Sequence, residues 1–315
     1  MYNKKLVVVC GPTASGKTSL AVAIAKSIGG EIISVDSRQV YRGMDIGTGK
    51  DLDEYHDDSF AIPYHLIDIC EPETIYTLHN YIDDFYAVYD SVKKRNVYGI
   101  LTGGTGLYIE AVLKGYDLPS IPEDADFRNR CREREKDSLA RELEMCAPDL
   151  YKKTDLCSKK RIIRALEIAH YRSNVTTVPK IRPKIDSVIM CTMWERSLLW
   201  ERIDKRLADR LNAGMIDEVQ RILDSGISRE RFSMFGMEYK FISQYIDNEV
   251  SYDEMVDKLK IAIHQLSKRQ ETWFRGMERR GCTVHWVENA RYDVAMDILR
   301  DELILPLSEG TSKTS

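Results

Sequence analysis

The feature that most constrains this chain is the glycine-rich string at residues 11–18, Gly-Pro-Thr-Ala-Ser-Gly-Lys-Thr. An apolar run at 6–10 precedes it, and a run with helical spacing follows at 19–25. A buried strand that leads through a glycine turn into a helix directs backbone N–H groups and the helix dipole at one point. In such loops the lysine contacts terminal phosphates and the last hydroxyl can bind Mg²⁺. The string therefore predicts a polyphosphate site with Lys17 as its cation and Thr18 as its metal ligand.

Strands and helices alternate over the first hundred residues. Apolar runs predict strands at 6–10, 31–35, 65–69 and 97–101, and helical spacing predicts helices at 17–28 and 81–94. This alternation is typical of an α/β fold in which helices cover both faces of a parallel sheet. Ligands bind such sheets at the carboxyl ends of the strands, where Gly11, Asp36 and Gly103 fall.

The pattern changes after residue 115. Residues 124–171 are helical in spacing and rich in charge, an apolar run at 188–193 predicts a resumed strand, and helices are expected at 196–213, 217–224 and 253–280. A last strand is expected at 283–287. We therefore expect a P-loop-type parallel sheet in 1–115 and 186–306, an inserted all-helical domain in 116–185, and a loose tail in 307–315.

Charge is distributed unevenly along the chain. The whole chain has a net charge of −4, yet residues 151–185 contain ten Lys or Arg against two acidic residues. A long basic tract indicates an anionic partner such as nucleic acid. The alternative is a solvated, charge-rich helical face.

The seven cysteines are scattered, with no Cys-x-x-Cys pair, and the six histidines show no metal-ligand spacing. This usage favours reduced thiols in a cytoplasmic protein. The longest apolar runs are also too short to span a membrane.

Three further sets of residues could carry chemistry. Asp36 follows the second strand, where it is equally suited to act as a general base or to cap the next turn. The arginines at 202, 206 and 210 share one helical face, and one of them could clamp a leaving phosphate. The string at 268–275 mixes basic and aromatic residues, as RNA-binding surfaces do, although by itself it fits a core helix with a solvated face. At this point both phosphoryl transfer and displacement of a diphosphate remain open.

Taken together, these strings resemble the tRNA dimethylallyltransferase (tRNA isopentenyltransferase) family. The family's motifs occur in order at 11–18, 36–48, 65–68, 103–108, 161–167 and 268–275. The stretch 40–48 and the block 268–275 are more specific than the phosphate loop. The chain departs from many relatives at 156–160 and around Glu238, and it lacks the zinc finger of eukaryotic relatives, which indicates a bacterial type.

The resemblance implies transfer of a dimethylallyl group from its diphosphate to N6 of adenosine 37 in tRNA, with release of diphosphate. Asp36 would be the general base, Thr105 would hydrogen-bond near the reacting centre, and Lys17 and Arg206 would neutralise the leaving group. Mg²⁺ would bind at Thr18. The diphosphate would lie on Gly11, Pro12, Thr13, Ala14, Ser15, Gly16, Lys17 and Thr18.

The resemblance also implies an extended contact with the anticodon stem–loop, made by a monomeric enzyme that does not associate with membranes. The residues expected at this contact are Asp36, Ser37, Arg38, Gln39, Thr105, Arg128, Lys160, Arg161, Ile162, Ile163, Arg164, Phe235, Gly236, Met237, Glu238, Tyr239, Lys240, Lys268, Arg269, Gln270, Glu271, Thr272, Trp273, Phe274 and Arg275.

Three alternatives stay open on the sequence. A prenyltransferase acting on free adenine nucleotides would not need the basic insert or the 268–275 block. A nucleoside or small-molecule kinase would leave the 40–48 match unexplained. A catalytically silent RNA-binding relative would not need Lys17, Thr18, Asp36 and Thr105 together.

Overall fold

The computed structural model of the protein describes residues 4–57, 59–116, 121, 123–174 and 182–303. The chain divides into two compact units, Met1–Gly115 with Pro183–Ser315, and Tyr116–Arg182. The tail expected at 307–315 lies outside the described residues.

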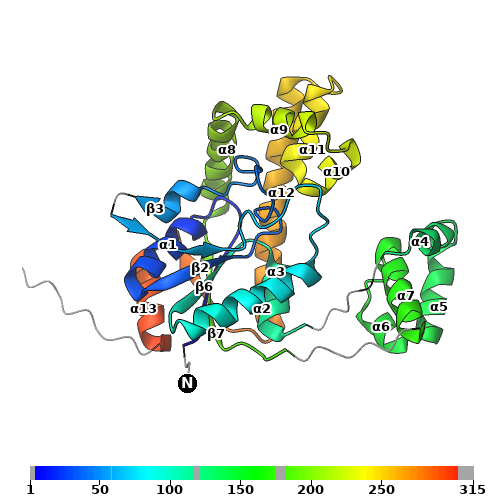
Figure 1. The fold of residues 1–315 in the computed structure, drawn as a ribbon, viewed down its shortest axis with the longest axis horizontal. Coiled ribbons are helices and arrows are strands. Elements are labelled where there is room, and N and C mark those ends of the chain that lie inside the picture. Colours follow the sequence, from blue (N-terminus) through cyan, green and yellow to red (C-terminus); the bar gives the residue numbers. More distant parts are fainter. Residues whose placement is uncertain (1–3, 58, 117–120, 122, 175–181, 304–315) are drawn as a thin grey trace, which may run out of the picture. The chain divides into compact units, whose positions relative to one another are not determined.

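The first unit is built on a six-stranded sheet in which all neighbouring strands are parallel (Figure 1). All five residues of β1 are fully buried, since helices cover both faces of the sheet, and the predicted α/β class is confirmed. The strand order is β5 (Tyr64–His65), β2 (Gly30–Ser34), β6 (Tyr98–Gly103), β1 (Leu6–Cys10), β7 (Ser187–Met193) and β8 (Val284–Glu288).

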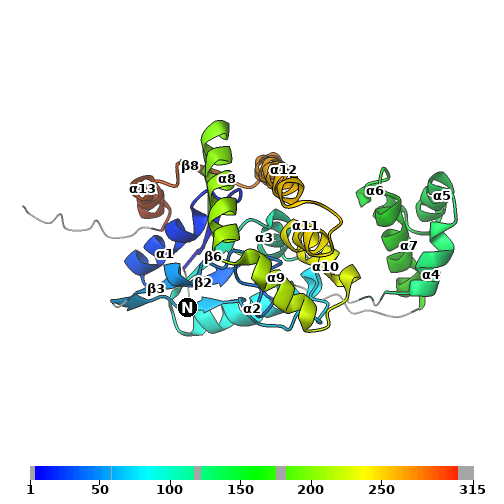
Figure 2. The same cartoon turned by 90° about the horizontal axis from the view of Figure 1, so that it is seen from above.

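Helices α1 (Lys17–Ile28) and α13 (Tyr292–Leu303) pack on one face of this sheet, against Val7 and Val9 of β1. Leu6, which points to the other face, lies near Tyr89 of α2 (Leu78–Lys94), and α3 (Gly106–Lys114) packs beside α2. Figure 2 shows α2 and α13 on opposite sides of the sheet.

A second group of helices lies along α12 (Tyr252–Arg279), as both views of the fold show. Its apolar core includes Val40, Tyr41 and Met44 from the segment that follows β2, so the helices bury that segment against themselves. The other members are α8 (Arg196–Asn212), α9 (Met215–Asp224), α10 (Arg229–Phe235) and α11 (Met237–Ile246).

The prediction of a strand at 65–69 is wrong beyond residue 65. β5 ends at His65, and Leu66 and Asp68 have positive φ values of 63° and 55°. The apolar run is instead a turn that points the Asp68 carboxylate at Lys50. Sequence reasoning also missed α3, α10, α11, α13, the turn of 3₁₀ helix η1 (Leu52–Tyr55) and a small hairpin of β3 (His56–Asp57) and β4 (Phe60–Ala61).

The second unit is helical over its described residues and has its own core of apolar side chains, among them Leu139, Leu143 and Leu166. Its helices are α4 (Ala125–Arg132), α5 (Lys136–Cys146), α6 (Pro148–Lys153) and α7 (Lys159–Asn174). Within the described ranges of the chain, no helix is both long and apolar enough to cross a membrane.

Candidate active site

The phosphate loop forms as the sequence predicts, between the end of β1 and the first residue of α1. Gly16 has a φ of 81°, a left-handed conformation that glycine adopts without steric cost, and α1 begins at the next residue. The Lys17 ammonium donates to the Pro12 carbonyl at 3.2 Å, and the Thr13 N–H donates to the side-chain oxygen of Gln270 at 2.9 Å. Gln270 in turn donates to the Gly104 carbonyl at 3.1 Å, which ties α12 to both glycine turns.

Lys17 lies near two other cations, Arg206 and Arg210, whose effect is partly offset by the carboxylates of Asp36 and Asp51. Burial, and to a smaller extent the charge of Arg206, lowers the pKa of its ammonium to about 8. An anion placed in the loop would reverse this shift, because an opposite charge nearby favours the ionised form. The loop is therefore suited to bind a polyanion.

Arg206 and Arg210 extend this positive region from α8. Arg206 bonds to the Asp51 carboxylate, and Arg210 lies 3.8 Å from the same group. Burial, followed by the charge of Arg206, lowers the pKa of Arg210. Sequence reasoning named Arg206 as catalytic but left out Arg210, although the two share the helical face noted above.

Asp36 caps the turn that follows β2 and also borders a cavity, and its role as a general base stays a prediction. Its Oδ1 accepts the Arg38 N–H at 2.8 Å, which caps the turn, while its side chain lines the same cavity as Lys17. The Ser37 N–H reaches the Thr105 hydroxyl at 3.4 Å, so Thr105 lies directly beside this turn. The carboxylate therefore borders the space next to the phosphate loop.

A cavity of about 310 Å³ joins these groups, with Asp36 and Thr105, Lys17 and Thr18, and Arg206 and Arg210 among its lining. A second hollow of about 260 Å³ adjoins the phosphate loop and shares Lys17, Thr18 and Arg206 with the first. One space thus connects a carboxylate to a set of cations and backbone N–H groups.

The segment 235–240 contributes unevenly to this cavity. Glu238 lines it, and burial raises the pKa of the Glu238 carboxyl. Phe235, Gly236 and Met237 also line it, although the rings of Phe235 and Tyr239 are buried in the core of the α8–α12 group. Lys240 is exposed.

The block 268–275 divides between core and surface. The ring of Phe274 is buried, and Trp273 packs so closely on Gly106 that no side chain would fit there. Gln270 reaches the cavity, while Glu271 pairs with Arg275. The exposed members are Lys268, Arg269, Thr272 and Arg275.

In the second unit, α7 presents Lys160 and Arg161 at its exposed start, and Ile162 and Ile163 belong to the unit's core. Arg128 and Arg164 both bond to Glu167, a carboxylate only 3% exposed; Arg128 thereby links α4 to α7, whereas Arg164 pairs with Glu167 within α7. Their ion pairs have a structural role that the sequence motif did not indicate.

Known proteins resemble this chain over most of its length. A family profile described as IPP transferase matches residues 39–277, and one described as isopentenyl transferase matches residues 4–59. The tRNA dimethylallyltransferase 1 of Parabacteroides distasonis is 48% identical over 289 residues, which cover 91% of this chain and 94% of that protein. The tRNA dimethylallyltransferase 1 of Syntrophus aciditrophicus is 45% identical over 302 residues, with 95% and 99% covered.

Comparison with solved structures finds proteins of the same kind. The full-length tRNA isopentenylpyrophosphate transferase from Bacillus halodurans has a TM-score of 0.69, is 32% identical and is matched over 96% of both chains. A eukaryotic dimethylallyltransferase acting on tRNA has a TM-score of 0.77 at 20% identity, covering 98% of this chain and 82% of that one, and supports the fold alone. With three quarters of its length matched by the profile and nearly half of its residues shared with curated relatives, this chain belongs to the IPP transferase family.

Proposed function

We propose that this protein transfers a dimethylallyl group from dimethylallyl diphosphate to N6 of adenosine 37 in the anticodon loop of tRNA, releasing diphosphate. The observation that carries the proposal is the cavity that joins the Asp36 carboxylate to Lys17, Arg206 and Arg210. The curated relatives are named tRNA dimethylallyltransferases, which supports the same donor and acceptor.

The donor half of the site stabilises the leaving group. As the bond between the allylic carbon and the diphosphate oxygen breaks, negative charge grows on that oxygen. Lys17, Arg206 and the N–H groups of the loop at 11–18 surround the place where this charge would develop. Preorganised donors of this kind stabilise a transition state without having to reorganise.

The acceptor half supplies a base. The N6 nitrogen forms the new bond to the allylic carbon and becomes positively charged, and Asp36 takes the proton that N6 must then lose. Thr105, beside Asp36, would hydrogen-bond near the same centre. Because a base stacked in an RNA loop could not enter a cavity of about 310 Å³, adenosine 37 would have to flip out of its stack.

The residues present fit a magnesium ion. Thr18 lines both hollows beside the loop, and Mg²⁺ in phosphate sites takes few protein ligands, with water and phosphate oxygens supplying the rest. Among the described residues no group of three or more His, Cys, Asp or Glu could hold a metal. When bound, Mg²⁺ would supply further positive charge to the leaving diphosphate.

For the tRNA we propose two exposed basic regions, one in each unit. The first is the outer side of the α12 block, with Lys268, Arg269 and Arg275, and the second is the start of α7, with Lys160 and Arg161. Buried side chains such as Phe274 and Ile162 would support these surfaces from within. We further propose that residues 1–115 and 186–306 form the catalytic core, which carries the α12 contact, and that residues 116–185 are a separate tRNA-binding insertion, in a cytoplasmic monomer.

The test is a nucleoside assay by mass spectrometry. The protein is incubated with Mg²⁺, dimethylallyl diphosphate and unmodified tRNA carrying adenosine 37, with AMP and ATP as parallel acceptors. We expect N6-dimethylallyl adenosine in the tRNA alone, and tRNA with guanosine at position 37 is the matched control. Product on AMP would instead indicate the free-nucleotide activity, and ATP turnover without prenylation a kinase.

A further inference from the structure

One wall of the donor region is formed by residues 45–51, which we call the platform. Gly49 has a φ of 64°, and a Cβ on it would collide with the Arg210 guanidinium and lie 2.9 Å from Nη2 of Arg206. The platform ends at Asp51, whose carboxylate contacts both arginines. The two guanidinium groups therefore rest directly on this segment.

The arginines need such a support because their charges repel. The charge of Arg206 contributes to the lowered pKa of both Lys17 and Arg210. Three cations around one cavity would spread apart unless fixed groups held them. The position of the platform thus decides how closely the arginines approach the phosphate loop.

A buried carboxylate of α9 holds one side of the platform. Glu218 is 1% exposed, and its two oxygens accept the backbone N–H groups of three successive residues, Asp45 at 2.8 Å, Ile46 at 2.7 Å and Gly47 at 2.9 Å. It also accepts the Tyr239 hydroxyl at 2.8 Å. A carboxylate with four donors is fully satisfied in this position, so it fixes the backbone of the platform.

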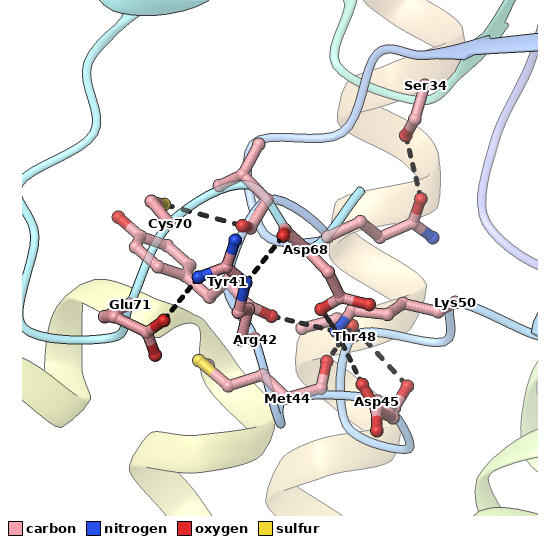
Figure 3. Close-up of polar contacts among 12 residues, drawn as sticks. Ser34, Tyr41, Arg42, Met44, Asp45, Thr48, Lys50, Asp68, Cys70 and Glu71 are labelled. Carbon is pink, nitrogen blue, oxygen red and sulfur yellow. Dashed lines mark hydrogen bonds and ion pairs between the residues drawn. The ribbon is translucent and has the colours of Figure 1, made fainter. Parts of the chain in front are cut away.

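A buried ammonium holds the other side. Lys50 is 1% exposed and donates to the Tyr41 carbonyl at 2.8 Å, to the Asp45 carboxylate at 2.5 Å and to Asp68. Figure 3 shows the lysine side chain directed at these three groups, which come from separate turns of the chain. Lys50 thereby closes the segment 41–50 into a compact loop and anchors it to the turn after β5.

We propose, on the basis of the function proposed above, that Glu218 and Lys50 are positioning residues of the donor site. By bracing the platform from two sides, they hold Arg206 and Arg210 next to each other where the diphosphate binds. Neither residue lines the cavity or the adjoining hollow, so both act through the arginines.

The proposal can be tested by calorimetric binding of inorganic diphosphate to the full chain. Glu218→Gln keeps the size of the side chain but removes its charge, and we expect it to weaken binding about tenfold. In an Arg206→Ala/Arg210→Ala background the same change should cost less than twofold, because a residue that acts through these two arginines loses its effect when both are gone. The matched control is Glu110→Gln, a carboxylate 2% exposed that pairs with Arg280 and Lys114, and it should leave binding unchanged.

Equal losses in both backgrounds would overturn the proposal, as would a Glu218→Gln protein that binds diphosphate normally. If the wild-type protein does not bind diphosphate, the donor site itself is refuted, and the bracing role with it. Should Glu218→Gln fail to fold, Gly49→Ala tests the same idea, because it displaces Arg210 from the platform while leaving both braces in place. We expect a similar tenfold loss that again disappears in the Arg206→Ala/Arg210→Ala background, and normal binding by Gly49→Ala would refute the platform's role.

Discussion

The phosphate loop at 11–18 and the platform at 45–51 lie around the same donor region but are built in different ways. The loop follows a strand–turn–helix pattern that is local in sequence, and distant residues, Gln270, Trp194 and Arg202, add hydrogen bonds to its backbone. The platform takes its shape from Glu218 on a distant helix and from Asp68 in another turn. Among the described residues Lys17 of the loop forms no ion pair, whereas Lys50 of the platform pairs with two carboxylates, so we expect the loop to be specialised for binding and the platform for structure.

The largest expected effect belongs to neither region. Asp36→Asn retains the side-chain oxygen that caps the turn at Arg38 but is no longer a base. We expect kcat to fall roughly 100- to 10,000-fold, the usual contribution of a general base, with the affinity for dimethylallyl diphosphate within twofold of the wild type. Single-turnover kinetics together with donor binding measures both quantities. A large loss of donor affinity would mean that Asp36 belongs to the binding apparatus.

The same substitution in the two regions provides the sharpest contrast. Lys50→Met removes the ammonium that pairs with two partly exposed carboxylates and leaves the Tyr41 carbonyl without its donor, so we expect the free energy of unfolding to fall by about 1–3 kcal/mol. Lys17→Met removes a charge that burial disfavours, so the free energy of unfolding at pH 7 should stay equal or rise.

Denaturant titrations of the two variants, with donor binding measured in parallel, check this contrast. Lys17→Met should lose donor affinity while remaining as stable as the wild type. If both variants were destabilised equally, the distinction between a binding region and a structural one would not hold.

This contrast also explains what could be predicted from sequence. The phosphate loop, the parallel sheet and the cavity position of Asp36 follow from local patterns, and the structure contains all three. The bracing by Glu218 could not be predicted, because a glutamate in an amphipathic helix gives no sign that its partners are backbone N–H groups 171–173 residues away. The run at 65–69 was misread for a related reason, since the role of Asp68 depends on Lys50.

A pH titration of donor binding tests the electrostatics of the loop. With a pKa of about 8 in the free protein, Lys17 is charged below pH 8 and neutral above it. Bound diphosphate favours the charged form, so binding above pH 8 must take up a proton. The affinity for dimethylallyl diphosphate should therefore fall only about twofold from pH 7 to 8 and then by up to about tenfold per pH unit. Lys17→Met should abolish this dependence, and an unchanged pH profile in that variant would assign the proton to another group.

The smallest effect is expected on tRNA binding by the second unit. Reversing the charges of Lys160 and Arg161 removes two exposed cations at the start of α7. Each lost phosphate contact reduces the slope of log affinity against log salt concentration by about one. We expect tRNA affinity to fall roughly tenfold at low salt, with donor binding unaffected. The matched control reverses Lys152 and Lys153, which are equally exposed on α6. If the control variant loses as much affinity and slope as the α7 variant, the second unit attracts tRNA by its overall charge, and the start of α7 has no specific part in recognition.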